Sequence, residues 1–592
     1  MDVFEFRQRV IADYERFSRS FSKIRADDIA QFIDAEYRAE KFWPAPLVQL
    51  NPNFVSGDTI EGLVDAGLLH EECRRIFRAE KTPQDMGKAM RLHKHQEDAI
   101  RAAQRGDSYV LTTGTGSGKS LAYFIPIVHD ILRRRSQGDP CTGISAIVIY
   151  PMNALCNSQL EELQKFLTHG YGIGKEPVTY ARYTGQESTE ERQKLAEHPP
   201  DILLTNYVML ELIMTRQDFP DPQVVAHAQG LRFLVLDELH TYRGRQGADV
   251  AMLVRRVRER LNLHLLCVGT SATMASEGTA ADRSTAVATI ATRLFGAQVH
   301  PANVITETLE RVTPDESPMD GGTLAAALRA GLPAHPSYET LLQHPVAAWI
   351  EMRLGLERED GTPEGKLVRM SKPQTLRQAA AMLAEDTGLD VSACETYLAQ
   401  FLLLAYHTRS PSTGRSLLAF RLHQFIAGAG DLYGTLEPPG MRYLTVNGQQ
   451  FKPGARDKTL FTLCFCRECG QEYHPVWATV AAGQPVRFEA RELTERSHED
   501  DEVLFGYFMP DMAGSFDAAD IENGLYPEDW IDFGATPPRL KANYRRYRPR
   551  PLSVAPDGAT GAGVAGWFIP GTFRFCLQCG IAYDGAVRSD LT

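Results

Sequence analysis

The chain has 592 residues, of which 43% are hydrophobic and 23% charged, a balance typical of folded protein that excludes a disordered or collagen-like chain. At roughly 150 residues per domain, this length predicts about four domains. Because 75 acidic residues outnumber 63 basic ones, the net charge of −12 excludes binding of nucleic acid by bulk positive charge, so any such binding must use local groups.

The sequence also bears on location. It has no run of about 18 consecutive apolar residues, so no membrane span is predicted. The first residues, MDVFEFRQRVIADYERF, lack the apolar core and cleavage site of a secretory signal, which leaves the cytoplasm as the expected location. Five of the ten cysteines lie near the C-terminal end, and in a cytoplasmic chain such a cluster favours metal binding over disulfides.

We expect four regions along an α/β chain. Residues 1–88 have apolar residues at helical spacing and predict an N-terminal helical accessory domain. Between 89 and 315, apolar runs such as SYVLTT, SAIVIYP and RFLVLDE alternate with helical patterns, which predicts a parallel sheet with helices on both faces. Residues 316–440 are expected to be mainly helical, and 441–592 rich in strands.

A glycine-rich loop, LTTGTGSGKS, lies between a strand-like run and a helical pattern. This is the context of a phosphate-binding loop, whose N–H groups curl around phosphate oxygens while the helix dipole adds attraction. We expect Lys119 to reach the β- and γ-phosphates of ATP and Ser120 to coordinate Mg²⁺. The strict pattern has glycine at the position of Thr113. The predicted nucleotide-binding residues of the loop are Thr113, Gly114, Thr115, Gly116, Ser117, Gly118, Lys119 and Ser120.

Three further side chains would complete a nucleotide site. Gln96, in LHKHQEDAI, carries an amide that can both donate to and accept from adenine. Asp237 and Glu238 follow the apolar run LRFLVL, and carboxylates at the end of a strand face the ligand crevice of an open α/β sheet. We expect Asp237 to hold Mg²⁺ and Glu238 to activate the attacking water, so that Lys119, Asp237 and Glu238 are the catalytic residues.

Other strand ends predict coupling and nucleic-acid contacts. His240, with the hydroxyl residues Ser271 and Thr273 of CVGTSATM, is expected to connect the acidic pair to the neighbouring surface. Backbone N–H groups, amides and hydroxyls at strand ends can position phosphates of a nucleic acid without reading bases. The candidates for DNA contact are Pro151, Asn153, Thr184, Gly185, Thr205, Asn206, Arg243 and Arg245.

Two similar segments, CRECGQEY and CLQCGIAY, each place two cysteines on one turn. Together they predict a tetrahedral zinc site formed by Cys466, Cys469, Cys576 and Cys579. Cys464 and His474 are alternative ligands, and an iron–sulfur cluster is the alternative to zinc. The nearby run KANYRRYRPRP fits either a surface that binds single-stranded nucleic acid or an ordinary basic strand.

Taken in order from about residue 92 to 273, these motifs resemble the first RecA-like lobe of a superfamily-2 DEAD/DEAH-like helicase. DELHTYRGRQGADVAMLVRRV looks like the large bacterial helicases of the YprA/MrfA class. The segments WPAPLVQLNP, GLLHEEC and FRLHQFIAGAG are most similar to the Druantia-type anti-phage defence helicase, the E component. The resemblance implies ATP-driven translocation or unwinding of DNA, with ATP and Mg²⁺ as cofactors beside Zn²⁺ and other defence subunits as partners.

Such a motor needs a second RecA-like lobe, which supplies an arginine-rich segment of the form Gln-x-x-Gly-Arg-x-x-Arg. Residues 300–592 contain no such segment and no second alternation of strands and helices. We therefore expect the chain to be the front half of a helicase, and to hydrolyse ATP weakly because an arginine finger contributes about 10³–10⁵ in rate. The alternatives are an ATP-sensing DNA-binding subunit, whose second lobe comes from a partner or is absent, and a zinc scaffold with a vestigial ATP site.

Overall fold

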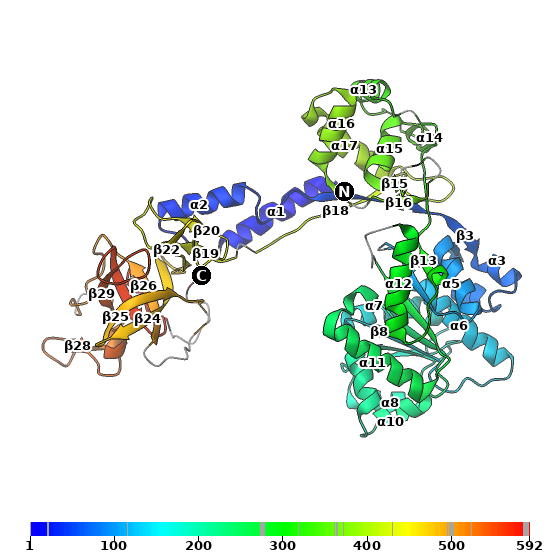
Figure 1. Ribbon diagram of the computed structural model, residues 1–592, viewed down its shortest axis with the longest axis horizontal. Coiled ribbons are helices and arrows are strands. Elements are labelled where there is room, and N and C mark those ends of the chain that lie inside the picture. Colours follow the sequence, from blue (N-terminus) through cyan, green and yellow to red (C-terminus); the bar gives the residue numbers. More distant parts are fainter. Residues whose placement is uncertain are drawn as a thin grey trace.

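The computed structural model describes residues 2–20, 23–114, 116–272, 279–317, 319–334, 336–359, 362, 365–370, 372–428, 430–493, 495, 503–521, 524–583 and 591. Figure 1 shows two bodies, one with the parallel sheet and a cluster of helices, the other rich in strands. Helix α1 (Val3–Ser20) and an extended stretch after β18 (Ala419–His423) connect them. No helix among the described residues is long and apolar enough to cross a membrane.

The α/β lobe is built on a seven-stranded, fully parallel sheet in the order β13-β7-β12-β11-β8-β10-β9, which confirms the predicted fold class. The strands are β7 (Tyr109–Thr112), β8 (Ala146–Tyr150), β9 (Tyr180–Tyr183), β10 (Ile202–Asn206), β11 (Phe233–Leu236), β12 (Leu266–Ser271) and β13 (Val304–Thr306). The covering helices are α5 (Lys94–Gln104), α6 (Leu121–Ser136), α7 (Asn153–Leu163), α8 (Thr189–Glu197), α9 (Tyr207–Thr215), α10 (Asp221–His227), α11 (Gly244–Leu261) and α12 (Ala280–Phe295).

Strand periodicity explains why both faces of this sheet are covered. Along β8, Ala146 and Val148 pack into one core with α5, α6 and α7, whereas Ile147 and Ile149 pack into a second core with α9 to α12. Because successive strand residues point to opposite faces, a continuous apolar run fills both cores at once. All the strand ends that carry predicted site residues therefore meet at one edge, the carboxyl edge of the sheet.

The predicted N-terminal helical domain of residues 1–88 is not one unit in the structure. Helix α2 (Asp27–Arg38) packs through Ile29 on strands of the C-terminal body. β1 (Leu47–Asn51) pairs antiparallel with β17 (Gln374–Thr375) and β18. Helices α3 (Ile60–Asp65) and α4 (Cys73–Ile76) add to the core of the α/β lobe. The physical reason is that LVQLN has a period-2 pattern, whose apolar face needs a sheet and a core supplied from elsewhere in the chain.

A helical unit follows the lobe in sequence and lies beside β13 in space (Figure 1). Its helices are α13 (Gly321–Ala330), α14 (Tyr338–Leu342), α15 (Pro345–Ile350), α16 (Leu376–Thr387) and α17 (Val391–His407). They share one core with Val48 and Leu50 of β1. The hairpin of β15 (Leu356–Arg358) and β16 (Leu367–Arg369) extends from this unit.

The C-terminal body contains an eight-stranded antiparallel sheet in the order β20-β19-β23-β24-β26-β30-β29, with β25 paired to β24. Its strands are β19 (Leu432–Gly434), β20 (Leu444–Thr445), β23 (Phe461–Phe465), β24 (Glu472–Ala481), β25 (Gln484–Ala490), β26 (Val503–Pro510), β29 (Arg550–Val554) and β30 (Val564–Pro570). Short strands elsewhere are β2 (Asn53–Phe54), β3 (Ser56–Thr59), β4 (Arg78–Ala79), β5 (Lys88–Ala89), β6 (Arg91–His93), β14 (Leu309–Glu310), β21 (Phe451–Lys452), β22 (Ala455–Thr459), β27 (Ile531–Asp532) and β28 (Arg539–Leu540).

Candidate functional site

The glycine-rich loop connects β7 to α6 at the carboxyl edge of the sheet. Gly116 and Gly118 have φ values of 81° and 69°, a left-handed conformation in which a side chain would be strained. The Thr113 and Ser117 hydroxyls are 2.6 Å apart and close the base of the loop. The loop therefore has a fixed curve with exposed backbone at Gly116 and Gly118. Thr115 lies outside the described residues.

Gln96 forms a hydrogen bond with the backbone of this loop. Its Nε2 donates to the Gly118 carbonyl at 2.9 Å, and its Oε1 accepts from the His93 amide at 2.8 Å. His95, which sequence reasoning missed, donates from Nε2 to the Ser117 carbonyl at 2.9 Å, and burial lowers its pKa, so the ring is neutral. Gln96 thus positions the phosphate loop, while its predicted contact with adenine stays a prediction.

The three predicted catalytic residues come together at the same edge. Lys119 is half-buried, and the loss of solvent around it lowers its pKa, while the nearby carboxylates of Glu238 and Asp237 oppose that shift by attraction. Burial raises the pKa of Asp237, while a hydrogen bond from the Thr270 hydroxyl opposes it. The site can hold Mg²⁺ in chemical terms, because the Asp237 carboxylate and Ser120 hydroxyl offer the hard oxygen ligands that this ion prefers.

Glu238 has a strained backbone that aims its side chain. Its φ of 52° and ψ of 54° are left-handed, which costs a non-glycine residue about 1–3 kcal/mol. Its Oε2 lies 3.2 Å from His240 Nδ1, and the same nitrogen lies 3.3 Å from Ser271 Oγ. Two of the three predicted coupling residues therefore form a chain of contacts with the acidic pair. The third, Thr273, lies outside the described residues.

Thr270 is a site residue that the motif did not indicate. It immediately precedes Ser271, and its hydroxyl both donates to the Asp237 carboxylate and accepts from the Glu238 amide at 3.3 Å. The available signal was its place on β12, the strand next to β11, whose end carries the two acids. Thr270 thus contacts both residues of the acidic pair, a role that the sequence predicts for Ser271 and Thr273.

We expect Thr270→Val to shift the pH dependence of ATP hydrolysis. The variant removes a hydrogen bond that stabilises the ionised Asp237, so the pKa of Asp237 rises further and activity is lost at a higher pH on acidification. The loss of a hydrogen bond to a charged group predicts a shift of about one pH unit. A pH profile of ATP turnover measures it, and an acidic limb identical to that of the wild type would contradict the role given to Thr270.

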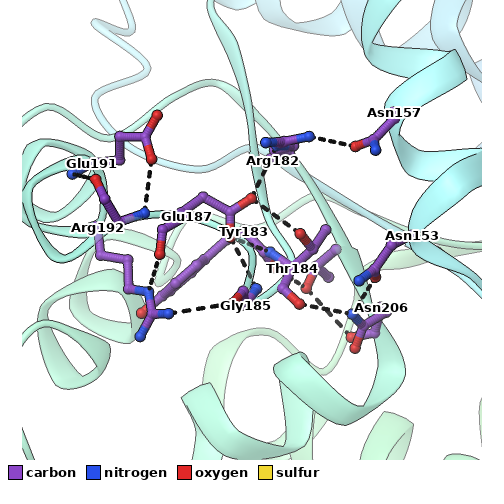
Figure 2. A network of polar contacts seen from close by, with 12 residues as sticks. Asn153, Asn157, Arg182, Tyr183, Thr184, Gly185, Glu187, Glu191, Arg192 and Asn206 are labelled. Carbon is purple, nitrogen blue, oxygen red and sulfur yellow. Dashed lines mark hydrogen bonds and ion pairs between the residues drawn. The ribbon is translucent and has the colours of Figure 1, made fainter.

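Five of the predicted DNA-contact residues line one hollow of about 590 Å³ at the ends of β8, β9 and β10. These residues are Pro151, Asn153, Thr184, Gly185 and Asn206. Figure 2 shows Asn206 between two neighbours, where its Nδ2 donates to Asn153 Oδ1 at 2.8 Å and to the Thr184 carbonyl at 3.1 Å. Arg192, Arg216 and Gln246 also line the hollow, and sequence reasoning did not assign them.

Glu187 organises the turn beside this hollow (Figure 2). Its carboxylate accepts from the Thr184 and Gly185 amides at 2.8 and 2.9 Å and forms an ion pair with Arg182 at 3.0 Å. Arg192 donates to the Glu187 carbonyl at 3.1 Å. The two amides that we expected to meet a DNA phosphate are therefore bonded to an internal carboxylate.

The other three predicted DNA contacts lie elsewhere. Thr205 is fully buried, and its hydroxyl donates to the Tyr183 carbonyl at 2.6 Å. Its side chain points into the lobe because it sits one residue before the strand end, on the opposite face from Asn206. Arg243 and Arg245 are exposed at the start of α11, next to Gln246, but neither lines the hollow.

The four predicted zinc ligands form a compact group, with all four sulfur atoms within 4.8 Å of one another. Cys466 and Cys579 Sγ are 3.9 Å apart, and Cys469 and Cys576 Sγ 3.6 Å. Zn–S bonds of about 2.3 Å in a tetrahedron place the sulfur atoms about 3.8 Å apart, so this group fits zinc. Hydrogen bonds with the Cys576 thiol and the Tyr583 hydroxyl lower the pKa of Cys466, whereas burial raises the pKa of Cys469.

The two turns have the same backbone geometry. In each, the glycine after the second cysteine is left-handed, with φ of 76° at Gly470 and 74° at Gly580, and donates to the carbonyl of the first cysteine. The alternative ligands do not join the group. Cys464 is buried on β23, which raises its pKa to about 12, and His474 is buried on β24, which lowers its pKa to about 3.

The basic run near the zinc group packs its aromatic rings against the protein. Tyr544 stacks on Trp530 with ring centroids 4.8 Å apart, and the Arg574 guanidinium lies 5.1 Å from the Tyr547 ring. These contacts fit the reading of KANYRRYRPRP as a basic surface of the C-terminal body better than that of a platform for stacking bases.

Comparisons with known proteins define the class of the lobe. Residues 93–281 match the family model described as DEAD/DEAH box helicase. This part of the chain is therefore similar to the helicase domain of DEAD/DEAH box helicases, as the motifs predicted.

The relatives narrow this class. The chain is 32% identical over 167 residues to the uncharacterized ATP-dependent helicase YprA of Bacillus subtilis (strain 168), covering 28% of this chain and 20% of YprA. It is 25% identical over 301 residues to the Druantia protein DruE of Escherichia coli (strain UMEA 4076-1), covering 32% of this chain and 16% of DruE. A crystal structure of the DUF1998 helicase MrfA bound to DNA and AMPPNP is similar with a TM-score of 0.33 and 21% identity, covering 50% of this chain and 38% of that one. The matched part of the chain is thus similar to YprA and DruE, and it spans a fifth or less of the length of these two curated relatives.

Proposed function

We propose that this chain contains the first motor lobe of an ATP-dependent DNA helicase or translocase. One observation carries the proposal: the ATP-type site and the DNA-type hollow open at the same carboxyl edge of one sheet. Lys119 lies in the loop after β7, and Asp237 and Glu238 directly follow β11. Asn153 follows β8, and Asn206 is the last residue of β10. A shared edge allows nucleotide state to alter the grip on a nucleic-acid backbone.

The roles follow from the geometry. Lys119 would hold the terminal phosphates of ATP, since it is a half-buried cation at the end of the phosphate loop. Asp237 and Ser120 would hold Mg²⁺, which supplies neutralisation of the phosphate charge when bound. Glu238 would accept the proton of the attacking water. The contacts from Glu238 to His240 and from His240 to Ser271 would couple this change in the charge of Glu238 to β12.

We further propose that the lobe works with a second RecA-like lobe that lies outside these 592 residues. The described residues contain one parallel sheet of this kind, and both curated relatives are several times longer than the matched part. Without the arginine that such a lobe supplies, hydrolysis by this chain would be weak. The Druantia relative supports a role in anti-phage defence, with other defence subunits as partners. The alternative, an ATP-sensing DNA-binding subunit, would bind both ligands without turnover.

The zinc group would be structural. It joins β23 to a segment more than a hundred residues later, and all four positions are filled by protein sulfur, which leaves no open position for chemistry.

Arg216→Ala tests the DNA part of the proposal. Arg216 lines the hollow, and its side chain is 44% exposed. Loss of one phosphate contact is expected to weaken binding of a single-stranded oligonucleotide by about 3- to 10-fold and to reduce the salt dependence of binding by about one ion. Arg293→Ala, an exposed arginine on α12 away from the hollow, is the matched control and should change neither. If the two variants have the same DNA affinity and the same salt dependence of binding, the proposal that this hollow binds DNA is refuted.

A further inference from the structure

Two arginines from outside the lobe lie against the phosphate loop. Arg369 ends β16 and Arg421 lies in the middle of β18, both in the helical unit. A Cβ placed on Gly114 would lie 2.9 Å from Arg369 Nη2, and a Cβ on Gly116 would lie 2.7 Å from Arg421 Nη2. The loop and the helical unit are therefore in contact through two guanidinium groups.

The alternation of β1 and β18 explains the position of Arg421. Val48 and Leu50 point into the core of the helical unit, so the intervening residues form the opposite, polar face. Arg421 is paired in register with Gln49 on that face, where His423 Nε2 also bonds Gln49 Oε1 at 2.8 Å. The helical core thus fixes the strand so that its polar face, with the exposed Arg421, is directed at the loop.

Arg369 reaches the loop through a carboxylate. Its Nε and Nη2 donate to Glu307 at 3.2 and 3.4 Å, and its Nη1 donates to Asn51 Oδ1 at 3.4 Å. Glu307 follows β13 directly, and its Oε2 accepts from the Gly114 amide at 2.9 Å. One anionic group is therefore held between an amide of the phosphate loop and a guanidinium of the helical unit.

The chemistry of these groups favours a phosphate ligand. A guanidinium carries five N–H donors and no acceptor, and a phosphate loop also presents N–H donors. Two sets of donors that face each other are stabilised by an anion between them, and Glu307 already acts as one at the edge of the site. Phosphate oxygens accept from a guanidinium in the same two-pronged way as a carboxylate.

We propose that Arg369 and Arg421 contact the phosphate groups of the bound nucleoside triphosphate, so that the helical unit completes the nucleotide site of the lobe within the same chain. Glu307 accepts from Arg369 in the structure, and by this proposal the phosphates of a bound nucleotide would take over that contact. This inference rests on the proposed ATP site. It also gives a route by which nucleotide binding draws the helical unit against the lobe.

The test is titration of the full 592-residue chain with Mg²⁺–ATP and with AMP. Arg421→Ala and Arg369→Ala should each weaken ATP binding by about 10-fold or more, with a much smaller effect on AMP, because a lost contact to a charged group has that size. Arg329→Ala, an exposed arginine at the far end of the unit on α13, is the control and should stay within about twofold. Glu307→Gln should bind ATP more tightly than wild type, an effect that damage to the fold cannot produce.

The outcomes separate this inference from the proposed function. If both arginine variants bind ATP like wild type while Lys119→Ala does not bind, the inference is overturned and the ATP site stands. Weaker ATP binding by Glu307→Gln would overturn the exchange of partners at Arg369. A wild-type chain that binds no ATP overturns the site and the inference together.

Discussion

Lys119→Ala is expected to weaken binding of Mg²⁺–ATP by about 100-fold or more, as the loss of a charge-assisted contact to the terminal phosphates predicts. Lys119 is a half-buried cation of the site, and its charged form is favoured by attraction to Glu238, Asp237 and Glu307. Removing the ammonium leaves these carboxylates to repel the incoming phosphates. The effect is therefore larger than that of deleting an exposed lysine.

Calorimetric titration of the full chain with Mg²⁺–ATP measures this change. Lys165→Ala is the matched control, because Lys165 is an exposed lysine of the same lobe that pairs with Glu162 on its own helical turn. The control should bind like wild type, since exposed ion pairs contribute little. Equal affinity for all three proteins would show that the loop does not bind nucleotide and would leave a zinc scaffold as the better account.

The double variant Cys576→Ser, Cys579→Ser is expected to lose its zinc and most of the stability of the C-terminal body. Structural zinc sites contribute on the order of 10 kcal/mol to folding, and this one joins two distant segments. Cys576 is fully buried, and its sulfur also accepts from the Tyr473 hydroxyl at 3.2 Å, so the site is continuous with the core. Loss of the metal therefore frees both turns and loosens the packing around Tyr473.

Metal analysis by mass spectrometry and thermal unfolding measure both effects. Cys464→Ala is the matched control, because Cys464 is buried two residues before Cys466 but outside the group. It should keep about one zinc per chain, while the double variant keeps none. Zinc retained by the double variant would refute the four-cysteine site, and iron with visible absorption in the wild type would identify an iron–sulfur cluster instead.

The lobe could be predicted from sequence because its signals are local. Apolar runs of strand length alternate with helical patterns, and parallel strands have their carboxyl ends at one edge, so motifs at successive strand ends had to meet. That reasoning brought Lys119, Asp237 and Glu238 together without a structure. The two Cys-x-x-Cys turns could also be predicted from sequence, since each turn places its own pair of thiols close together.

The remaining features depend on contacts between distant segments. Glu307, Arg369 and Arg421 reach the phosphate loop from residues about 190 to 300 positions away, and no motif connects them. Helical spacing in residues 1–88 predicts one domain there, whereas LVQLN pairs with strands more than 300 positions later. Pairing between such distant strands depends on which apolar faces pack together, and the local pattern of a single sequence does not show this.

Single-turnover hydrolysis tests the central claim most directly. The full chain, in excess over labelled ATP and with single-stranded DNA present, is compared with Glu238→Gln; this design detects slow chemistry that steady-state turnover would miss. The account predicts slow but measurable hydrolysis by wild type and a loss of about 100-fold or more in the variant, with ATP binding unchanged, since a general base contributes about 10²–10⁴ in rate. Equal rates in the two proteins would contradict the account, because Glu238 would then have no part in the chemistry.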